Sequence, residues 1–133
     1  MPHMHTVTIA WGDCDEAGLV FYPTYFYWMD SSFNFWLHEL SLSQRILHAR
    51  FAAHTPLVDA GARFMGPARY DDRLVIETSV ESWSARSFRV RHRGASEGRP
   101  VFEGHEVRIW GVLDEDGRLK AAPVPSAFRE ALA

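Results

Sequence analysis

The sequence has a single cysteine, no long apolar run and no excess of basic charge. A lone Cys14 cannot form a disulfide within the chain, which favours a reducing compartment. No segment approaches the roughly 20 apolar residues of a membrane span, and the first residues lack the pattern of a signal peptide, so we expect a cytoplasmic protein. A formal net charge of −3 offers no broad basic surface for a nucleic-acid backbone. Neither a membrane nor a nucleic acid is therefore expected as a partner.

What the chain does contain is typical of a globular protein. Hydrophobic residues make up 47% and aromatic residues 14% of its 133 positions. This length suits one domain with a substantial core, and no repeat, low-complexity tract or linker divides it. We therefore expect a single domain over residues 1–133. No spacing of Cys and His resembles a structural zinc site, and no cofactor is expected.

The first 53 residues predict a strand, a loop and two helices. Residues 5–11 alternate imperfectly and are followed by loop formers over 12–18. Pro23 suits the first turn of a helix that runs without Gly or Pro to Leu40, and residues 43–53 suggest a second, short helix. Because apolar side chains cover much of the long helix, we expect other structure to wrap most of it.

The remainder of the chain is strand-rich. Alternating patterns predict strands over residues 74–81, 88–93 and 101–113, then a turn at 114–117 and a short helix from about Ser126. In the last of these strands Val107 and Ile109 alternate with Glu106 and Arg108. Consecutive strands with short turns favour an antiparallel sheet, which can curl around an apolar helix. The predicted class is α+β.

Two carboxylates precede the long helix and form the first candidate site. Asp13 and Asp15 lie in the loop just before a helix N-terminus, where unpaired N–H groups and the positive end of the helix dipole can hold a developing oxyanion. A carboxylate beside such a donor can attack a carbonyl or activate a water. The structural alternative is that both are turn formers and helix caps, as most loop Asp residues are.

Residues 12–23, Gly-Asp-Cys-Asp-Glu-Ala-Gly-Leu-Val-Phe-Tyr-Pro, resemble the signature of hot-dog thioesterases related to 4-hydroxybenzoyl-CoA thioesterase. Segments 70–78, 86–88 and 105–109 resemble the same family in the same order, so the similarity spans nearly the whole chain. It implies a hot-dog fold, in which an antiparallel sheet curls around a central helix, and cofactor-free hydrolysis of an acyl-CoA thioester. It also implies a homotetramer built as a dimer of dimers, with each active site at a dimer interface.

The resemblance assigns roles to individual residues. Asp15 stands at the position of the catalytic carboxylate, and Tyr22 at the position whose backbone N–H polarises the thioester carbonyl. Substrate-binding positions fall on Asp30, Thr55, Arg86 and Lys120. Asp30 matches a helix carboxylate that faces the acyl group, whereas Arg86 and Lys120 match basic contacts to coenzyme A phosphates. The structural alternatives are a hydrogen-bonded helix Asp and two solvated surface charges.

Two departures from the family pattern bear on the substrate. Ser84 replaces a further basic residue, which leaves the nucleotide contacts less well defined. Pro23 follows Tyr22 where thioesterases for aliphatic acyl groups usually carry a His, and this favours the aromatic branch of the family.

Several alternatives remain open from the sequence. The chain could be a thioesterase for aliphatic acyl-CoA, a catalytically silent subunit that binds acyl-CoA, or a hydratase or dehydratase of the same fold. Asp15 could act as nucleophile, through a covalent anhydride, or as the general base for a water. Cys14 could supply a thiolate nucleophile, although no activating His is adjacent in the sequence.

Overall fold

The computed structural model describes residues 1–133. No helix in it combines the length and apolarity needed to cross a membrane. Its elements, in chain order, are β1 (His3–Thr8), η1 (Trp11–Asp13), α1 (Pro23–Glu39), α2 (Gln44–Phe51), β2 (Ala53–His54), β3 (Leu57–Phe64), β4 (Arg73–Trp83), β5 (Ser87–Ser96), β6 (Arg99–Ile109), β7 (Gly111–Leu113), β8 (Leu119–Ala121) and α3 (Ser126–Ala131).

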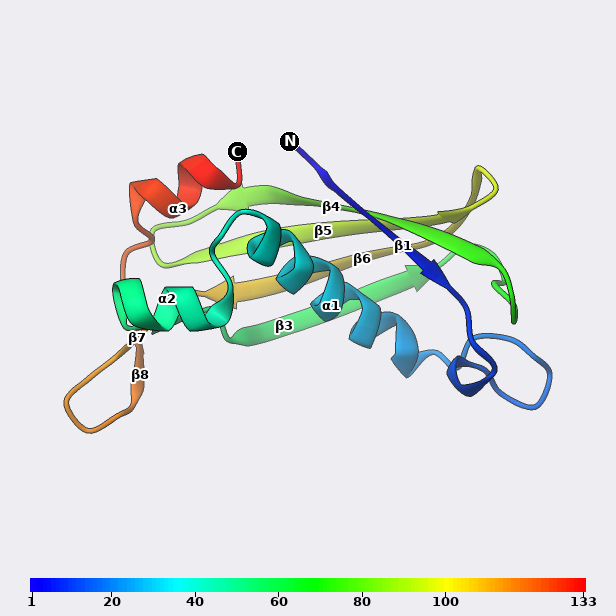
Figure 1. Cartoon of the computed structure of the whole chain (residues 1–133), viewed down its shortest axis with the longest axis horizontal. Coiled ribbons are helices and arrows are strands. Elements are labelled where there is room, and N and C mark those ends of the chain that lie inside the picture. Colours follow the sequence, from blue (N-terminus) through cyan, green and yellow to red (C-terminus); the bar gives the residue numbers. More distant parts are fainter.

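A five-stranded antiparallel sheet with one long helix across its face dominates the structure (Figure 1). The strand order is β1-β4-β5-β6-β3, and a separate three-stranded sheet has the order β2-β7-β8. Every pairing between strands is antiparallel. The predicted α+β class, with a helix packed on an antiparallel sheet, is confirmed.

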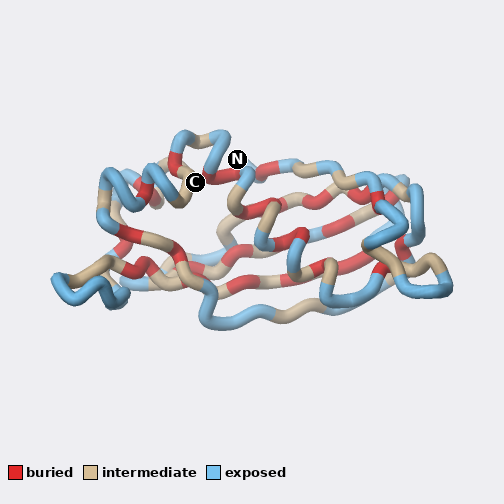
Figure 2. The backbone as a smooth tube through the Cα atoms, turned by 60° about the horizontal axis from the view of Figure 1, so that its bottom comes forward, coloured by how far each residue is buried: buried red, intermediate tan, exposed pale blue.

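Helix α1 forms where the sequence predicts it and packs on the sheet through one side. Pro23 occupies the first turn, where its missing N–H removes a donor that would have no partner within the helix. The buried side consists of Tyr25, Trp28, Met29, Ser32, Phe33, Trp36 and Leu37. The opposite side is open, with Tyr27 69% and Phe35 52% exposed. The expectation that other structure wraps most of the helix is therefore too strong for the single chain, as the tube in Figure 2 shows.

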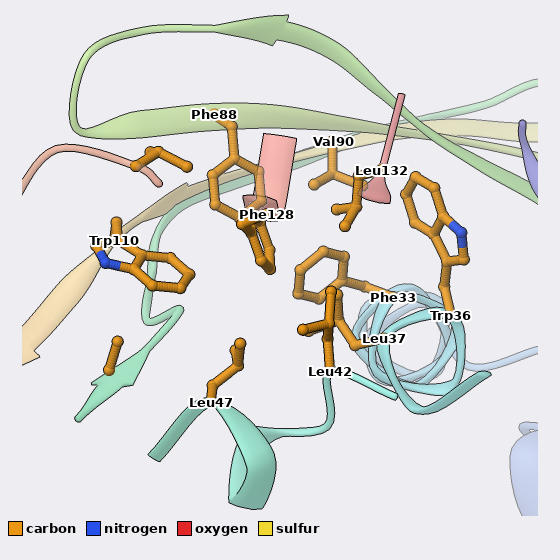
Figure 3. Packing of buried hydrophobic residues seen from close by; sticks show 12 residues of the cluster. Phe33, Trp36, Leu37, Leu42, Leu47, Phe88, Val90, Trp110, Phe128 and Leu132 are labelled. Carbon is orange, nitrogen blue, oxygen red and sulfur yellow. The ribbon is translucent and has the colours of Figure 1, made fainter. Parts of the chain in front are cut away.

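The core consists of two apolar clusters, one under each half of α1. Under the C-terminal half, Phe33 packs with Phe88 of β5 and Phe128 of α3, and the last two rings have centroids 5.5 Å apart (Figure 3). Under the N-terminal half, Met29 lies against Gly104 of β6, where a Cβ atom would overlap its sulfur. Burial of such side chains contributes about 1.5–3 kcal/mol each, which fixes α1 on the sheet.

Strand β3 is the principal element that sequence periodicity missed. It lies at the edge of the large sheet and pairs only with β6. Residues 57–60 are all exposed, so no buried face produced an alternation of apolar and polar residues. The first strand also ends earlier than expected, at Thr8, because residues 11–13 form a turn of 3₁₀-helix.

Strand β6 buries a different face from the one its alternation suggests. Glu106 and Arg108 are 1% and 4% exposed and, with Trp110, face the core, whereas Val107 and Ile109 are only partly buried. Charged side chains in a core need partners, because an unpaired buried charge is strongly destabilising. These partners connect the core to the candidate site.

Candidate active site

Asp13 has a structural role in the loop before α1. Its Oδ2 accepts a hydrogen bond from the Ala10 N–H at 2.8 Å, and its carbonyl oxygen accepts one from the Phe21 N–H at 2.9 Å. The carboxylate caps the 3₁₀ turn and the carbonyl joins the two ends of the loop. The structural alternative, in which Asp13 is a turn former and cap, therefore accounts for this residue.

Asp15 is held differently, with one carboxylate oxygen fixed and the other free. Oδ1 accepts hydrogen bonds from the backbone N–H groups of Ala17 at 2.9 Å and Leu19 at 3.2 Å. The Asp15 N–H donates to the Leu19 carbonyl at 2.8 Å, and Gly18 makes the tight turn between them with a φ of 76°. Oδ2 has no partner within the chain, and the residue is exposed. The loop thus presents a preorganised carboxylate to solvent.

The backbone N–H of Tyr22 is an unused donor at the start of α1. Tyr22 has helical backbone angles and is followed by Pro23, which has no N–H. The Thr24 N–H donates to Phe21 and the Tyr25 N–H donates to Tyr22, whereas the Tyr22 N–H donates to no group in the chain. A free donor at the positive end of a 17-residue helix is suited to an oxyanion.

The Asp15 carboxylate opens onto a largely apolar hollow of about 450 Å³. Trp11 and Phe21, which are 61% and 54% exposed, provide its aromatic walls. The complete lining is Trp11, Cys14, Asp15, Glu16 and Phe21. Exposed aromatic rings around a carboxylate suit an acyl group better than a polar ligand.

Cys14 is not poised as a nucleophile. Burial raises the pKa of its thiol, and the negative charges of Asp13, Asp15 and Asp72 raise it further, which outweighs the opposite effect of a backbone hydrogen bond from Tyr70. The Sγ atom lies 3.6 Å from the Ala10 carbonyl oxygen. A thiol that resists ionisation is a poor nucleophile, and this counts against the thiolate alternative.

Asp30 and Thr55 come together through Arg108, a residue that the sequence did not single out. Arg108 Nη2 donates to Asp30 Oδ1 at 2.7 Å, and Nη1 donates to the Thr55 carbonyl oxygen at 2.9 Å. Asp30 borders a hollow of about 520 Å³ on the outer side of α1. The Thr55 hydroxyl is buried and accepts a hydrogen bond from Gln44 at 2.8 Å. Asp30 is thus available to a ligand, whereas the Thr55 side chain is enclosed.

A row of buried polar side chains runs behind Arg108, between α1 and the sheet. The contacts in order are Ser32 to Thr78 at 2.9 Å, Thr78 to His92 at 2.8 Å, His92 to Glu106 at 2.8 Å and Glu106 to Arg108 at 2.8 Å. We call these five residues the buried polar row. Burial raises the pKa of Glu106, but the hydrogen bond from His92 and the charge of Arg108 together hold it below its usual value. The only signal for this row in the sequence was that Glu106 and Arg108 alternate onto the same strand face as Trp110.

Arg86 and Lys120 lie far from Asp15 within one chain. Arg86 follows β4 in the β4–β5 turn and Lys120 lies in β8, both at the end of the molecule where α2 and β7 lie (Figure 1). Asp15 belongs to the loop between β1 and α1 at the opposite end. Both basic side chains are exposed, and Lys120 Nζ is 3.8 Å from Asp114 Oδ2. A single chain does not bring these two cations to the Asp15 carboxylate.

Comparison with known proteins gives consistent matches over almost the full length. The family model described as the thioesterase-like superfamily matches residues 9–132. The chain is 34% identical to the 4-hydroxybenzoyl-CoA thioesterase of Pseudomonas sp. (strain CBS-3), over 92% of this chain and 91% of that protein.

Two solved structures are also similar. A variant of 4-hydroxybenzoyl-CoA thioesterase complexed with 4-hydroxybenzoyl-CoA superposes with a TM-score of 0.90, at 31% identity over 99% of both chains. A gentisyl-coenzyme A thioesterase superposes with a TM-score of 0.81, at 32% identity over 97% of this chain and 98% of that one.

Proposed function

The chain belongs to the thioesterase-like superfamily and is a thioester hydrolase, and from this premise we propose that it hydrolyses an aromatic acyl-CoA of the hydroxybenzoyl type. The products are the free carboxylic acid and coenzyme A. The observation that carries the proposal is the Asp15 carboxylate, fixed through one oxygen and free at the other, in the loop that leads to the unpaired N–H of Tyr22. Two of the similar thioesterases are named for 4-hydroxybenzoyl-CoA and gentisyl-CoA, and these names support the aromatic class.

The chemistry proposed for this pair needs no cofactor. The thioester carbonyl oxygen accepts a hydrogen bond from the Tyr22 N–H, which stabilises the negative charge that develops when the carbonyl carbon is attacked. Asp15 either attacks that carbon itself or removes a proton from an attacking water. The C–S bond then breaks and coenzyme A leaves as the thiolate, which takes the proton held by Asp15 in the water route or a proton from solvent in the nucleophilic route. In the first route water hydrolyses the resulting anhydride, which regenerates the carboxylate.

A second polar group for the substrate lies further along α1. Asp30 follows Tyr22 by eight residues, and its Oδ1 accepts a hydrogen bond from Arg108 while Oδ2 has no partner in the chain. A carboxylate is a strong acceptor for a hydroxyl on the acyl group. The proposed contacts are therefore the thioester carbonyl with the Tyr22 N–H and a ring hydroxyl with Asp30.

The free edge of β3 supports the proposal that a second copy of the chain supplies the coenzyme A contacts. Strand β3 has a free edge with exposed Leu57 and Val58, and such an edge is a template for another strand. Antiparallel pairing of two β3 strands about a twofold axis reverses the long axis of the partner. The end of the partner that carries Arg86 and Lys120 would then approach the Asp15 loop of the first chain. This arrangement supports the proposed dimers, and a homotetramer would join two of them.

A thiol-release assay across acyl groups tests the function. Wild-type protein should hydrolyse 4-hydroxybenzoyl-CoA with a kcat/KM at least about tenfold above that for a short aliphatic thioester, which corresponds to about 1.4 kcal/mol. Equal rates for both classes would favour the aliphatic alternative. Saturable binding of acyl-CoA without thiol release from any thioester would favour a silent binding subunit and overturn the proposal.

A further inference from the structure

The Asp30 carboxylate is held by a guanidinium whose own position is fixed by three other groups. Arg108 is 4% exposed, and its guanidinium lies 4.4 Å from the centre of the Phe33 ring. Glu106 and the Thr55 carbonyl each accept one of its N–H groups, which leaves the Nη2 nitrogen shared between Glu106 and Asp30. The planar fork of Arg can bridge three acceptors in this way, whereas the ammonium of Lys is a single point charge on a flexible stem.

The buried polar row fixes Glu106 in turn. With its proton on Nε2, His92 donates to Glu106 and accepts at Nδ1 from the Thr78 hydroxyl, which accepts from Ser32. Every hydrogen bond then points the same way, towards the Glu106 carboxylate. Because Ser32, Thr78, His92 and Glu106 are at most 1% exposed, no water competes for these bonds.

The buried polar row reaches the surface through Asp30, the exposed residue that Arg108 contacts. The Asp30 side chain is 57% exposed, and its Oδ1 accepts from Arg108 while Oδ2 has no partner in the chain. Asp30 also borders the hollow on the outer side of α1, together with Tyr27 and Asn34. One oxygen is thus anchored to the core and the other is left for a donor outside the chain.

We propose that Arg108, itself set by Glu106 and His92, is the positioning residue that orients Asp30 and thereby determines selectivity for an acyl group that carries a hydroxyl. The inference rests on the proposed function and deepens it, because it names the specificity determinant of the same site. Arg108 touches no reacting atom and acts only through Asp30. Its loss therefore weakens recognition of the ring hydroxyl while the Asp15 and Tyr22 groups remain in place.

The test is the ratio of kcat/KM for 4-hydroxybenzoyl-CoA to kcat/KM for benzoyl-CoA in four proteins. Asp30→Asn should lower this ratio by about tenfold, because the neutral amide is a weaker acceptor than a carboxylate. Arg108→Lys should lower it by a similar factor with little change for benzoyl-CoA. The ratio for the double variant Asp30→Asn/Arg108→Lys should be no lower than the ratio for either single variant, because both changes break the same contact between Arg108 and Asp30. Equal losses for both substrates in Arg108→Lys, or multiplicative losses in the double variant, would overturn the proposal.

A second variant covers the case in which Arg108→Lys fails to fold. The double variant Glu106→Gln/Arg108→Met removes both buried charges together, so neither charge is left in the core without its partner. It should show the same low ratio as Asp30→Asn, and a wild-type ratio would overturn the proposal.

Binding measurements separate this inference from the proposed hydrolysis. Thioether analogues of the two substrates, in which a methylene separates sulfur from the carbonyl, cannot be hydrolysed, and calorimetry gives their Kd values. Selective binding of the hydroxylated analogue that is lost in Arg108→Lys supports the positioning role even if the thioesters are not turned over. Hydrolysis of both thioesters with equal kcat/KM leaves the hydrolase assignment intact and refutes the positioning role.

Discussion

The two carboxylates of the proposed site, Asp15 and Asp30, are fixed by different means. Asp15 is oriented by backbone N–H groups two and four residues away, in a loop that supplies all its partners locally. Asp30 is oriented by Arg108, 78 residues away in the chain, and through it by the buried polar row. The group proposed for chemistry is thus oriented by a short segment, whereas the group proposed for specificity depends on contacts between distant parts of the chain.

The largest effect is expected when the buried contacts behind Asp30 are broken at Glu106. Glu106→Ala leaves the Arg108 charge in the core without its internal partner, which should lower the free energy of unfolding by about 3–5 kcal/mol. Denaturant unfolding followed by fluorescence measures this. The matched control is Glu103→Ala, because Glu103 on the same strand makes only half-exposed ion pairs and its loss should cost less than about 1 kcal/mol. Equal effects of the two variants would contradict the comparison.

Removing the charge of Asp15 should leave the fold intact and abolish most of the hydrolysis. Asp15→Asn keeps the acceptor for Ala17 and Leu19 but loses the charge, so hydrolysis should fall at least about 10²-fold. Steady-state thiol release gives the rate, and the unfolding midpoint should stay near that of the wild type. Near wild-type turnover in this variant would exclude Asp15 from the mechanism.

A third prediction concerns the proposed arrangement of two copies around each Asp15. Arg86→Ala with Lys120→Ala should raise KM with little change in kcat, because phosphate contacts stabilise substrate and transition state alike. At up to about 1 kcal/mol for each of the two exposed charge pairs, KM should rise by up to about 30-fold.

Coexpression of this double variant with Asp15→Asn chains tests the sharing of the site. In mixed dimers one site combines an intact Asp15 with intact cations from the partner, so about a quarter of all sites should recover the wild-type KM. Failure to recover any such sites would exclude the sharing of Asp15 and the two cations between chains.

Acid should weaken the buried contacts behind Asp30, because these contacts depend on the charge of Glu106. Because the pKa of Glu106 is lowered in the folded state from its ordinary value of 4.5, its stabilising contribution is present above that value. The contribution is lost as the pH falls from there through the folded pKa. Glu106→Gln should flatten the stability curve over this acid range, as measured by denaturant unfolding at several pH values. An unchanged pH slope would show that Glu106 does not govern it.

The smallest effect is expected beside the proposed catalytic carboxylate. Cys14→Ser should keep activity within about twofold of wild type, because the thiol is held protonated and donates only a weak hydrogen bond. Thiol-release kinetics check this. Severe loss of activity in a folded Cys14→Ser variant would revive the thiolate alternative.

The same contrast explains how far the sequence could predict the molecule. The loop at 12–23 could be predicted from the sequence because the residues that shape it are local, such as Gly18 at a positive φ and Pro23 in the first turn of α1. Helix α1 and strands β4 to β6 were also predicted, since a buried face imposes a period on the residues.

What the sequence could not give depends on contacts across the fold. Strand β3 has no buried face to produce a pattern, and its single pairing with β6 appears only in three dimensions. The partners of Arg108 come from α1, from the segment before β3 and from β6 itself. No short window of sequence contains them, so neither the row nor the enclosure of Thr55 could be foreseen.

The contact between Met29 and Gly104 has a consequence for how such an enzyme can acquire new substrates. Met29 directly precedes Asp30, and its sulfur occupies the space that a Cβ atom of Gly104 would fill. Sliding α1 by one turn, about 5.4 Å, would carry Met29 away from Gly104 and Asp30 away from Arg108. The helix is therefore locked in register, and acyl groups of another length call for exchanged side chains around the acyl group or for an acidic residue at another position along α1.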